Sequence, residues 1–282
     1  MENIHKLIAG KMEAMSKSQL KIATYILEHP NTIPFLTVGK LARITGVSDA
    51  TVVRFALFLG YSGYPELQEK LQQSIQRQLT TTERLKMSDE IYPDADQEVY
   101  DIFRDDMENI KSTLESLDLQ AFHKAVKVLS EANTVYIVAN RSALSLGIFM
   151  QYYLRFLIDR TELIHSTELA SEQMYALGEQ DVVIGISFFR YTKSTVDVFS
   201  YAKKKNATTL AITDHLLSPL IQHADLSLTA SSHLPAFIDS FVAPLSLINA
   251  LLVAVAREKK ENINEKLKGF EEMWENFDVF HK

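Results

Sequence analysis

The sequence predicts an all-α domain at the N-terminus, followed by an α/β domain built on a five-stranded parallel sheet. Residues 1 to 80 show helical spacing of apolar residues and no convincing strand pattern. After residue 133, short β-branched runs alternate with helical stretches, which is typical of a parallel sheet covered on both faces. A chain of 282 residues, 46% of them hydrophobic, can build one large domain or two smaller ones.

Composition narrows the possible chemistry. The net charge of −7 argues against a surface coated with basic residues. Residues 1 to 80 nevertheless carry 9 Lys and Arg against 6 Asp and Glu, whereas the remainder carries 20 against 30. The sequence has no cysteine, which excludes disulfides, thiolate nucleophiles and cysteine-based zinc sites. The two parts therefore look suited to different partners, and a reducing cytoplasm is the simplest compartment.

No segment predicts export or membrane insertion. The first 19 residues are polar and amphipathic, and they lack the apolar core of a secretory signal. The longest nearly apolar run, residues 241 to 256, is short for a membrane span and contains a proline. We expect a cytoplasmic protein with no membrane partner, in which this run is a buried helix.

The predicted N-terminal domain covers residues 1 to 79. Residues 16 to 30 form an amphipathic helix that stops at Pro30. Residues 37 to 61 hold two short helices separated by a glycine, and a further helix follows over 64 to 79.

Residues 80 to 96 are polar, contain Pro93 and lack periodicity, so they are predicted to be a linker. Two helices are expected over about 97 to 131. Their apolar side chains share one face, formed by Val99, Phe103, Met107, Ile110 and Leu114.

The predicted α/β domain spans residues 97 to 282. Its five strands are expected at "TVYIVA", "TELIHS", "DVVIGIS", "ATTLAITD" and "DLSLTA". Parallel sheets bind ligands at the carboxyl ends of their strands, where the winding direction switches. The turn "SFFRYT", which follows the third strand, is therefore a candidate pocket wall.

The segment "LARITGVSDATVVRF" has the pattern of a helix-turn-helix. Gly46 lies where the turn needs a positive φ, and Ser48 is expected to cap the second helix. The second helix would enter the major groove of DNA by its N-terminal residues, while two basic residues of the first helix are placed for backbone contacts. The alternative is a helical hairpin with no nucleic-acid role. The candidate DNA-binding residues are Lys40, Arg43, Ser48, Asp49, Ala50, Thr51 and Arg54.

The pattern "LA..TGVSDATVVRF...LGYSGYPEL", followed by an α/β unit, resembles the RpiR family of bacterial transcriptional regulators over nearly the whole chain. The resemblance implies a homodimer or homotetramer that reads a palindromic operator. It also implies a sugar isomerase (SIS) domain, with strand order 2-1-3-4-5, that binds phosphosugars without turning them over. One departure is "ALFLGY", which lacks the lysines common in relatives.

The expected ligand loops also depart from the family pattern. Relatives end the first strand in G-x-G-x-S and the third in S-x-S-G-x-T, where small residues wrap a phosphate. Here Ala139 and Arg141 occupy the glycine places of the first loop. In the third loop Ser187 and Thr192 match, but phenylalanine and arginine replace the inner serine and the glycine. The candidate ligand-binding residues are Asn140, Arg141, Ser142, Ser187, Phe189, Arg190, Tyr191, Thr192 and Ser240.

Two interpretations of these loops stay open. In one, Arg141 and Arg190 hold a carboxylate or phosphate, and the aromatic residues supply apolar walls. In the other the pocket has degenerated, and the arginines pair with carboxylates such as Glu168 or Asp214. Ser240, at the entry to the long apolar helix, either borders the pocket or only caps the helix.

No residue set predicts catalysis. His165, His215 and His233 have no evident nucleophile or carboxylate partner, and no metal or cofactor motif is present. The sequence therefore predicts a regulator that is not an enzyme and has no cofactor, whose operator binding responds to an anionic effector: a sugar phosphate, an amino sugar or a sugar acid. The alternatives are a sugar-phosphate isomerase with an accessory helical domain, and an oligomer that binds DNA without any effector.

Overall fold

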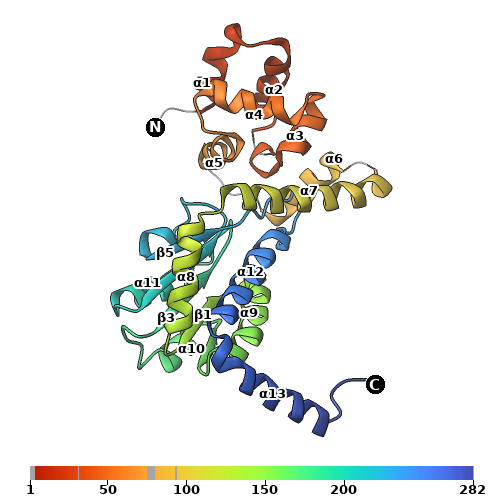
Figure 1. Cartoon of the computed structure of the whole chain (residues 1–282). Helices are drawn as coiled ribbons and strands as arrows, with labels where there is room; N and C mark the ends of the chain where they lie inside the picture. Colours follow the sequence, from red (N-terminus) through yellow and green to blue (C-terminus); the bar gives the residue numbers. More distant parts are fainter. Residues whose placement is uncertain (1–3, 31, 75–79, 93, 282) are drawn as a thin grey trace. The chain divides into compact units, whose positions relative to one another are not determined.

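The structure is a computed structural model that describes residues 4–30, 32–74, 80–92 and 94–281. It divides into two compact units (Figure 1). The first comprises the chain up to Glu115 together with Ser231–Ala243, and the second comprises Ser116–Ala230 together with Pro244–Lys282. The helix predicted to open the α/β domain thus belongs to the helical unit.

The first unit is built from helices. A capping box closes the start of its second helix, where Ser16 and Gln19 satisfy each other's backbone N–H groups. Fully buried apolar side chains such as Ile22, Phe55 and Leu67 form its core. The helices are α1 (Ile4–Lys11), α2 (Lys17–Glu28), α3 (Val38–Thr45), α4 (Asp49–Leu59), α5 (Tyr64–Ser74), α6 (Thr81–Ile91) and α7 (Ala95–Ser116), with 3-10 turns at Met12–Ala14 and Ile33–Phe35. The end of the helix predicted over 64 to 79 lies outside the described residues.

Residues 80 to 96 form mostly helix, which corrects the prediction of an irregular linker. Thr80 and Glu83 make a capping box at the start of α6. The side chain of Arg84, 3% exposed, pairs with Asp239 at 2.9 Å and donates to the carbonyl oxygen of Ile238 at 2.7 Å. Pro93 lies outside the described residues. A buried ion pair therefore holds α6 within the first unit.

Helix α7 has the reverse of the usual amphipathic arrangement. Its buried residues are the polar Asp105, Asn109 and Thr113, which recur every four residues. The predicted apolar face has the expected spacing, but it is exposed, with exposed fractions of 67% for Phe103 and 71% for Leu114. Packing inside the first unit therefore depends on the polar face of α7, and its apolar face is left for another surface.

The second unit contains the predicted parallel sheet. Its strands are β1 (Val135–Ala139), β2 (Thr161–Ile164), β3 (Val182–Ile186), β4 (Thr208–Thr213) and β5 (Leu226–Thr229). They are ordered β2-β1-β3-β4-β5, and every neighbouring pair is parallel. Both the predicted fold class and the strand order implied by the resemblance are confirmed.

Helices cover both faces of this sheet (Figure 1). On one face α10 and α11 pack over a core that includes Val183, Phe199 and Ala211. Helix α9 packs on the other face against β1 and β2, and α8 packs near β5. The helices of the second unit are α8 (Leu119–Glu131), α9 (Leu144–Leu157), α10 (Thr167–Gln173), α11 (Lys193–Lys204), α12 (Val242–Glu258) and α13 (Lys260–Asn276), with 3-10 turns at Arg141–Ala143 and Ile221–His223.

The apolar run at 241 to 256 forms α12. Among the helices in the described part of the chain, none combines the length and hydropathy needed to cross a bilayer.

Two glycines let helices approach the central strands closely. A Cβ at Gly185 of β3 would lie 2.7 Å from the ring of Phe199, and one at Gly147 of α9 would lie 2.9 Å from the Cβ of Ala139. Phe199 is fully buried, so its ring has no room to move away. These contacts fix the distance of α9 from β1 and of α11 from β3.

We expect Gly185→Ala to lower the free energy of unfolding by about 1–3 kcal/mol, because the new methyl group overpacks the core against Phe199. Urea denaturation followed by circular dichroism measures the change. Gly269→Ala in α13 is the matched control, since a Cβ there would meet no neighbouring atom within 4 Å. Equal stability of both variants would contradict the close packing.

Candidate functional site

The first unit contains the predicted helix-turn-helix. Thr37 caps α3 by accepting a hydrogen bond from the backbone N–H of Lys40. Gly46 ends α3 with a φ of 66°, in the left-handed region, and the N–H of Val47 donates to the carbonyl oxygen of Ala42 at 2.9 Å. This turn places α4 as the recognition helix.

The candidate residues on α4 are accessible. Ser48, Asp49, Ala50 and Arg54 are exposed, and Thr51 is partly exposed. Ser48 occupies the N-cap position, but it makes no side-chain cap hydrogen bond. Its hydroxyl instead pairs with the Thr51 hydroxyl at 2.9 Å, to which Arg54 also donates at 3.4 Å. The Ser48 side chain thus leaves the first N–H groups of α4 uncapped, although the N–H of Thr51 donates to the Ser48 carbonyl oxygen at 2.8 Å.

Lys40 and Arg43, the two candidates on α3 for contacts with the DNA backbone, are both paired with carboxylates of α7 in this conformation; Lys40 is buried, whereas Arg43 is exposed. The Lys40 side chain is 4% exposed, and its Nζ lies 2.8 Å from Asp101 Oδ2 and 4.2 Å from the centre of the Tyr92 ring. Arg43 pairs with Asp101 and also with Asp105, the latter at 3.3 Å. Both cations are neutralised by the acidic face of α7.

The carboxylates of this cluster differ in environment. Burial raises the pKa of Asp105, although hydrogen bonds from Tyr92 and Thr37 favour its charged form. Burial also raises the pKa of Glu108, whose carboxylate accepts a hydrogen bond from the N–H of Gly39 at 2.7 Å. Burial acts in the same upward direction at Asp101, but hydrogen bonds from Lys40 and Gln97 outweigh it and lower the pKa of Asp101. Helix α7 therefore contacts α3 through three carboxylates, of which Asp105 is buried and Asp101 and Glu108 are partly exposed.

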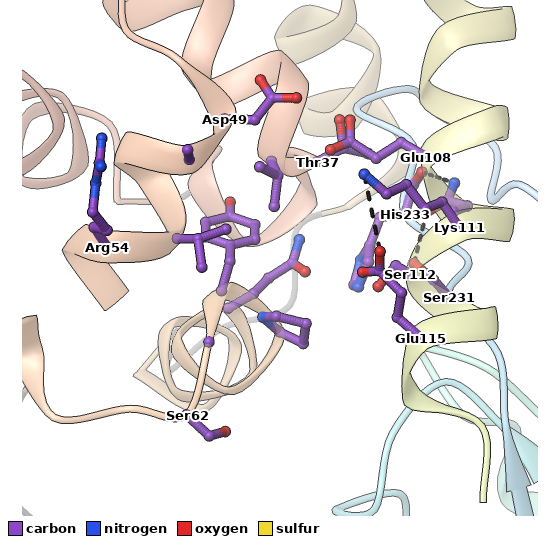
Figure 2. Close-up of a pocket in the computed structure, with 18 residues that line it drawn as sticks. Thr37, Asp49, Arg54, Ser62, Glu108, Lys111, Ser112, Glu115, Ser231 and His233 are labelled. Atoms are coloured by element: carbon purple, nitrogen blue, oxygen red, sulfur yellow. Dashed lines mark hydrogen bonds and ion pairs between the residues drawn. The ribbon is translucent and has the colours of Figure 1, made fainter. Parts of the chain in front are cut away.

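A cavity of about 650 Å³ lies in the first unit beside α4. Figure 2 shows the recognition helix on one side of it and α7 on the other. Its lining includes Asp49, Ala50, Val53 and Arg54 from α4, and Glu108, Lys111, Ser112 and Glu115 from α7. The N-terminal residues of the recognition helix thus face α7.

In the second unit the ends of β1, β3 and β4 lie level with one another. Ala139 is paired with Ile186, and Ile186 with Ile212. The first loop is tied to the start of α11, the helix that follows the third loop, because Asn140 Nδ2 donates to Thr195 Oγ1 at 2.9 Å. The structure therefore brings together the loops that carry most of the candidate ligand residues.

Both loop arginines adopt a glycine-like backbone. Arg141 has a φ of 56° and Arg190 a φ of 65°, values that L-residues with a Cβ seldom adopt. Both residues are exposed, as is Ser142 beside the first of them. Both loops therefore adopt a backbone conformation that favours glycine, yet each carries an exposed arginine side chain there.

Tyr191 is held by a hydrogen-bonded chain that no sequence pattern indicates. The N–H of Leu217 donates to His215 Nδ1, so the ring proton lies on Nε2, which is 3.0 Å from the Tyr191 hydroxyl. That hydroxyl donates in turn to Asp214 Oδ1 at 2.8 Å. The chain fixes the third loop against the end of β4, and it gives Asp214 partners other than the arginine pairing considered for it.

The remaining residues of the third loop differ in exposure. Ser187 is 3% exposed, and its hydroxyl accepts a long hydrogen bond from the N–H of Thr192. Thr192 occupies the N-cap of α11 without a side-chain cap bond. Phe188 is buried, whereas Phe189 is partly exposed. Ser187 thus shapes the loop, and Phe189 and Thr192 lie where a ligand can reach them.

Ser240 belongs to the first unit, not to the unit that contains the loops. Its hydroxyl donates to Asp106 Oδ1 at 2.5 Å and accepts from the N–H of Val242 at the start of α12. These contacts favour the capping role over the pocket-bordering one.

Comparisons with known proteins agree with both units. A model described as "Helix-turn-helix domain, rpiR family" matches residues 2–78, and a SIS domain model matches residues 128–254. An HTH-type transcriptional regulator of Caldanaerobacter subterraneus subsp. tengcongensis is 29% identical and covers 97% of each chain. The regulator HexR of Pseudomonas aeruginosa is 26% identical over 90% of this chain and 87% of its own.

Two solved structures are also similar. The sugar isomerase domain of an RpiR transcription factor from Sphaerobacter thermophilus has a TM-score of 0.59 and 26% identity, and covers 61% of this chain and 97% of its own. Vibrio vulnificus NanR, solved with ManNAc-6P, has a TM-score of 0.58 and 22% identity over 96% of this chain and 98% of its own, which shows a shared fold. With a helix-turn-helix and a SIS domain in this order, the chain belongs to the RpiR family of transcriptional regulators.

Proposed function

We propose that this regulator binds operator DNA through α4, and that an anionic small molecule held by the loops after β1 and β3 alters that binding. The observation that carries the effector proposal is the pair of arginines in left-handed conformations, Arg141 and Arg190. A non-glycine residue in this region costs roughly 1 kcal/mol, so the loops keep a strained backbone in order to place these side chains.

The chemistry of the two loops favours a polyol that carries a phosphate or carboxylate. Guanidinium groups bind such anions with two parallel hydrogen bonds. Asn140 and Thr192 supply neutral polar groups, and Phe189 supplies an apolar wall. We infer a sugar phosphate, an amino-sugar derivative or a sugar acid as the effector class, in keeping with the ManNAc-6P bound by NanR.

An isomerase function has less support. A histidine that acts as the base of an isomerase needs a free ring nitrogen near the substrate. Both ring nitrogens of His215 are engaged, one by the N–H of Leu217 and one by Tyr191. The relatives are named as transcriptional regulators, which agrees with a binding protein. We place its action in the cytoplasm, where the operator lies.

The exposed face of α7 supports a homodimer. Tyr100, Phe103, Met107, Ile110 and Leu114 recur at alternating spacings of three and four, the a and d positions of a heptad. In a parallel pair of α7 helices, Asp106 of one copy would face Lys111 of the other, whereas an antiparallel pair would bring Arg104 against Lys111. We therefore propose a parallel pairing, which suits two recognition helices that read a palindrome.

Removing the exposed arginine of the recognition helix tests DNA binding. We expect Arg54→Ala to weaken binding to the DNA upstream of the chain's own coding region by about 1–3 kcal/mol, because a base or phosphate contact is lost. Gel-shift titration at low salt measures the affinity. Arg257→Ala in α12 is the control and should bind like the unaltered chain; equal binding by the Arg54 variant would contradict the role of α4.

The loop arginines can be tested without DNA. We expect anionic sugars to raise the melting temperature of the unaltered protein by mass action, and Arg190→Ala to abolish that rise. Arg141→Gly should likewise abolish it, yet should raise the basal stability by up to about 1 kcal/mol because the positive φ suits glycine. A thermal-shift screen of phosphosugars, sugar acids and inorganic phosphate measures both effects. An unchanged ligand response in both variants would contradict the arginine site.

Polar substitutions on the exposed apolar face of α7 test the proposed dimer contact. We expect Phe103→Gln with Ile110→Gln to lower the molar mass measured by light scattering from that of a dimer to that of a monomer. Both side chains are exposed within one chain, so the folded monomer should lose little stability. Unchanged mass in the variant would show that another surface joins the copies.

A further inference from the structure

The buried polar face of α7 contacts α3 at the groups that a helix-turn-helix offers to DNA. Asp101 neutralises Lys40 and Arg43, and Glu108 accepts the backbone N–H of Gly39 in the first turn of α3. In proteins of this class the first helix crosses the DNA backbone, and N–H groups at a helix N-terminus bind phosphate oxygens. Carboxylate oxygens have the same acceptor chemistry as phosphate oxygens.

The backbone at Gly39 allows this close approach. A Cβ at this position would lie 2.7 Å from Glu108 Oε2, so any larger residue would displace the carboxylate from the start of α3. The glycine adopts no positive φ, so its backbone conformation alone does not require the missing side chain. What glycine provides at this position is room for an anion.

Helix α7 also lies across a cavity from the recognition helix, α4. The cavity between α4 and α7 measures about 650 Å³, which is the size of a small-molecule pocket. A DNA major groove is roughly 12 Å wide and is flanked by two phosphate backbones. Glu108 and Lys111 of α7 line the same cavity as Asp49 and Ala50, so α7 occupies space that a duplex needs in order to approach the start of α4 (Figure 2).

We propose that α7 is an autoinhibitory element, whose carboxylates Asp101, Asp105 and Glu108 occupy the DNA-phosphate positions of α3 and close off α4. DNA binding then requires α7 to leave α3, and phosphates replace the carboxylates on Lys40, Arg43 and Gly39. The apparent affinity for DNA is the affinity of the open form reduced by the fraction of molecules that are open. This inference rests on the proposed DNA-binding function.

The first test removes charge from the contact. We compare the full-length protein with Asp101→Asn/Glu108→Gln and with a charge-matched control, Asp89→Asn/Glu90→Gln, whose residues are exposed on α6. Fluorescence anisotropy with a labelled mixed-sequence duplex of about 30 base pairs, at about 50 mM salt, measures the dissociation constant. We expect the α7 variant to bind about tenfold more tightly and the control to bind within about twofold of the unaltered protein.

The outcomes separate this inference from the function on which it rests. If the unaltered protein binds the duplex and the α7 variant binds no more tightly than the control, autoinhibition by α7 is overturned and DNA binding stands. If none of the three proteins binds any duplex, DNA binding itself is overturned, and the inference with it.

A cross-link tests the same contact without relying on charge. The chain has no cysteine, so Gly39→Cys/Glu108→Cys introduces the only pair of thiols. A Cβ at Gly39 would lie 3.4 Å from Glu108 Cδ, so a short bis-methanethiosulfonate reagent, which spans the length of a side chain, can join the two cysteines reversibly. We expect the cross-linked protein to lose DNA binding and the protein released by reductant to regain it. Equal binding in both states would contradict the proposal.

Discussion

The buried carboxylate of Asp105 is the interaction on which the first unit depends. A charge removed from water is costly unless hydrogen bonds and an opposite charge compensate it. Here Thr37, Tyr92 and Arg43 surround the carboxylate, and they come from the start of α3, the end of α6 and the body of α3. Loss of any one partner leaves the charge less compensated, so the three elements are held in one arrangement. The placement of α3 and α6 against α7 thus depends on the partners of a single carboxylate.

In the second unit the corresponding constraint is the level ending of three parallel strands. Because β1, β3 and β4 stop at the same edge, the loops that follow them meet and are tied together by Asn140, Thr195 and the chain from His215 to Asp214. This support lets Arg141 and Arg190 hold conformations that an isolated loop would avoid. The rest of the domain therefore maintains a loop geometry that the arginines alone would not favour.

The fold could be predicted from the sequence because each of its signals is local. Period-2 and period-3.6 patterns, Gly46 at the turn and the β-branched runs depend on near neighbours in the chain. The failures involve distant partners. Nothing near Lys40 in the sequence indicates Asp101, which is 61 residues away. Likewise, the spacing of Phe103 and Leu114 predicts an apolar face correctly, but it does not show that the polar face of α7 is the buried one. Residues 81 to 91 have few apolar residues, yet they form a helix, since the capping box and the Arg84 ion pair add to the burial of Met87 and Ile91 on one face.

The assignment of α7 to the first unit changes where this protein can be cut. A division in the polar stretch before residue 97 looks natural from composition, but it would separate Lys40 and Arg43 from every carboxylate that neutralises them. An isolated fragment ending there would expose a lysine that the intact chain buries, leave an arginine without its carboxylate partners, and free the Gly39 N–H that Glu108 now accepts. Such a fragment would be more basic than the whole protein and would bind polyanions less selectively. Its DNA affinity would therefore be that of a helix-turn-helix without the α7 contact.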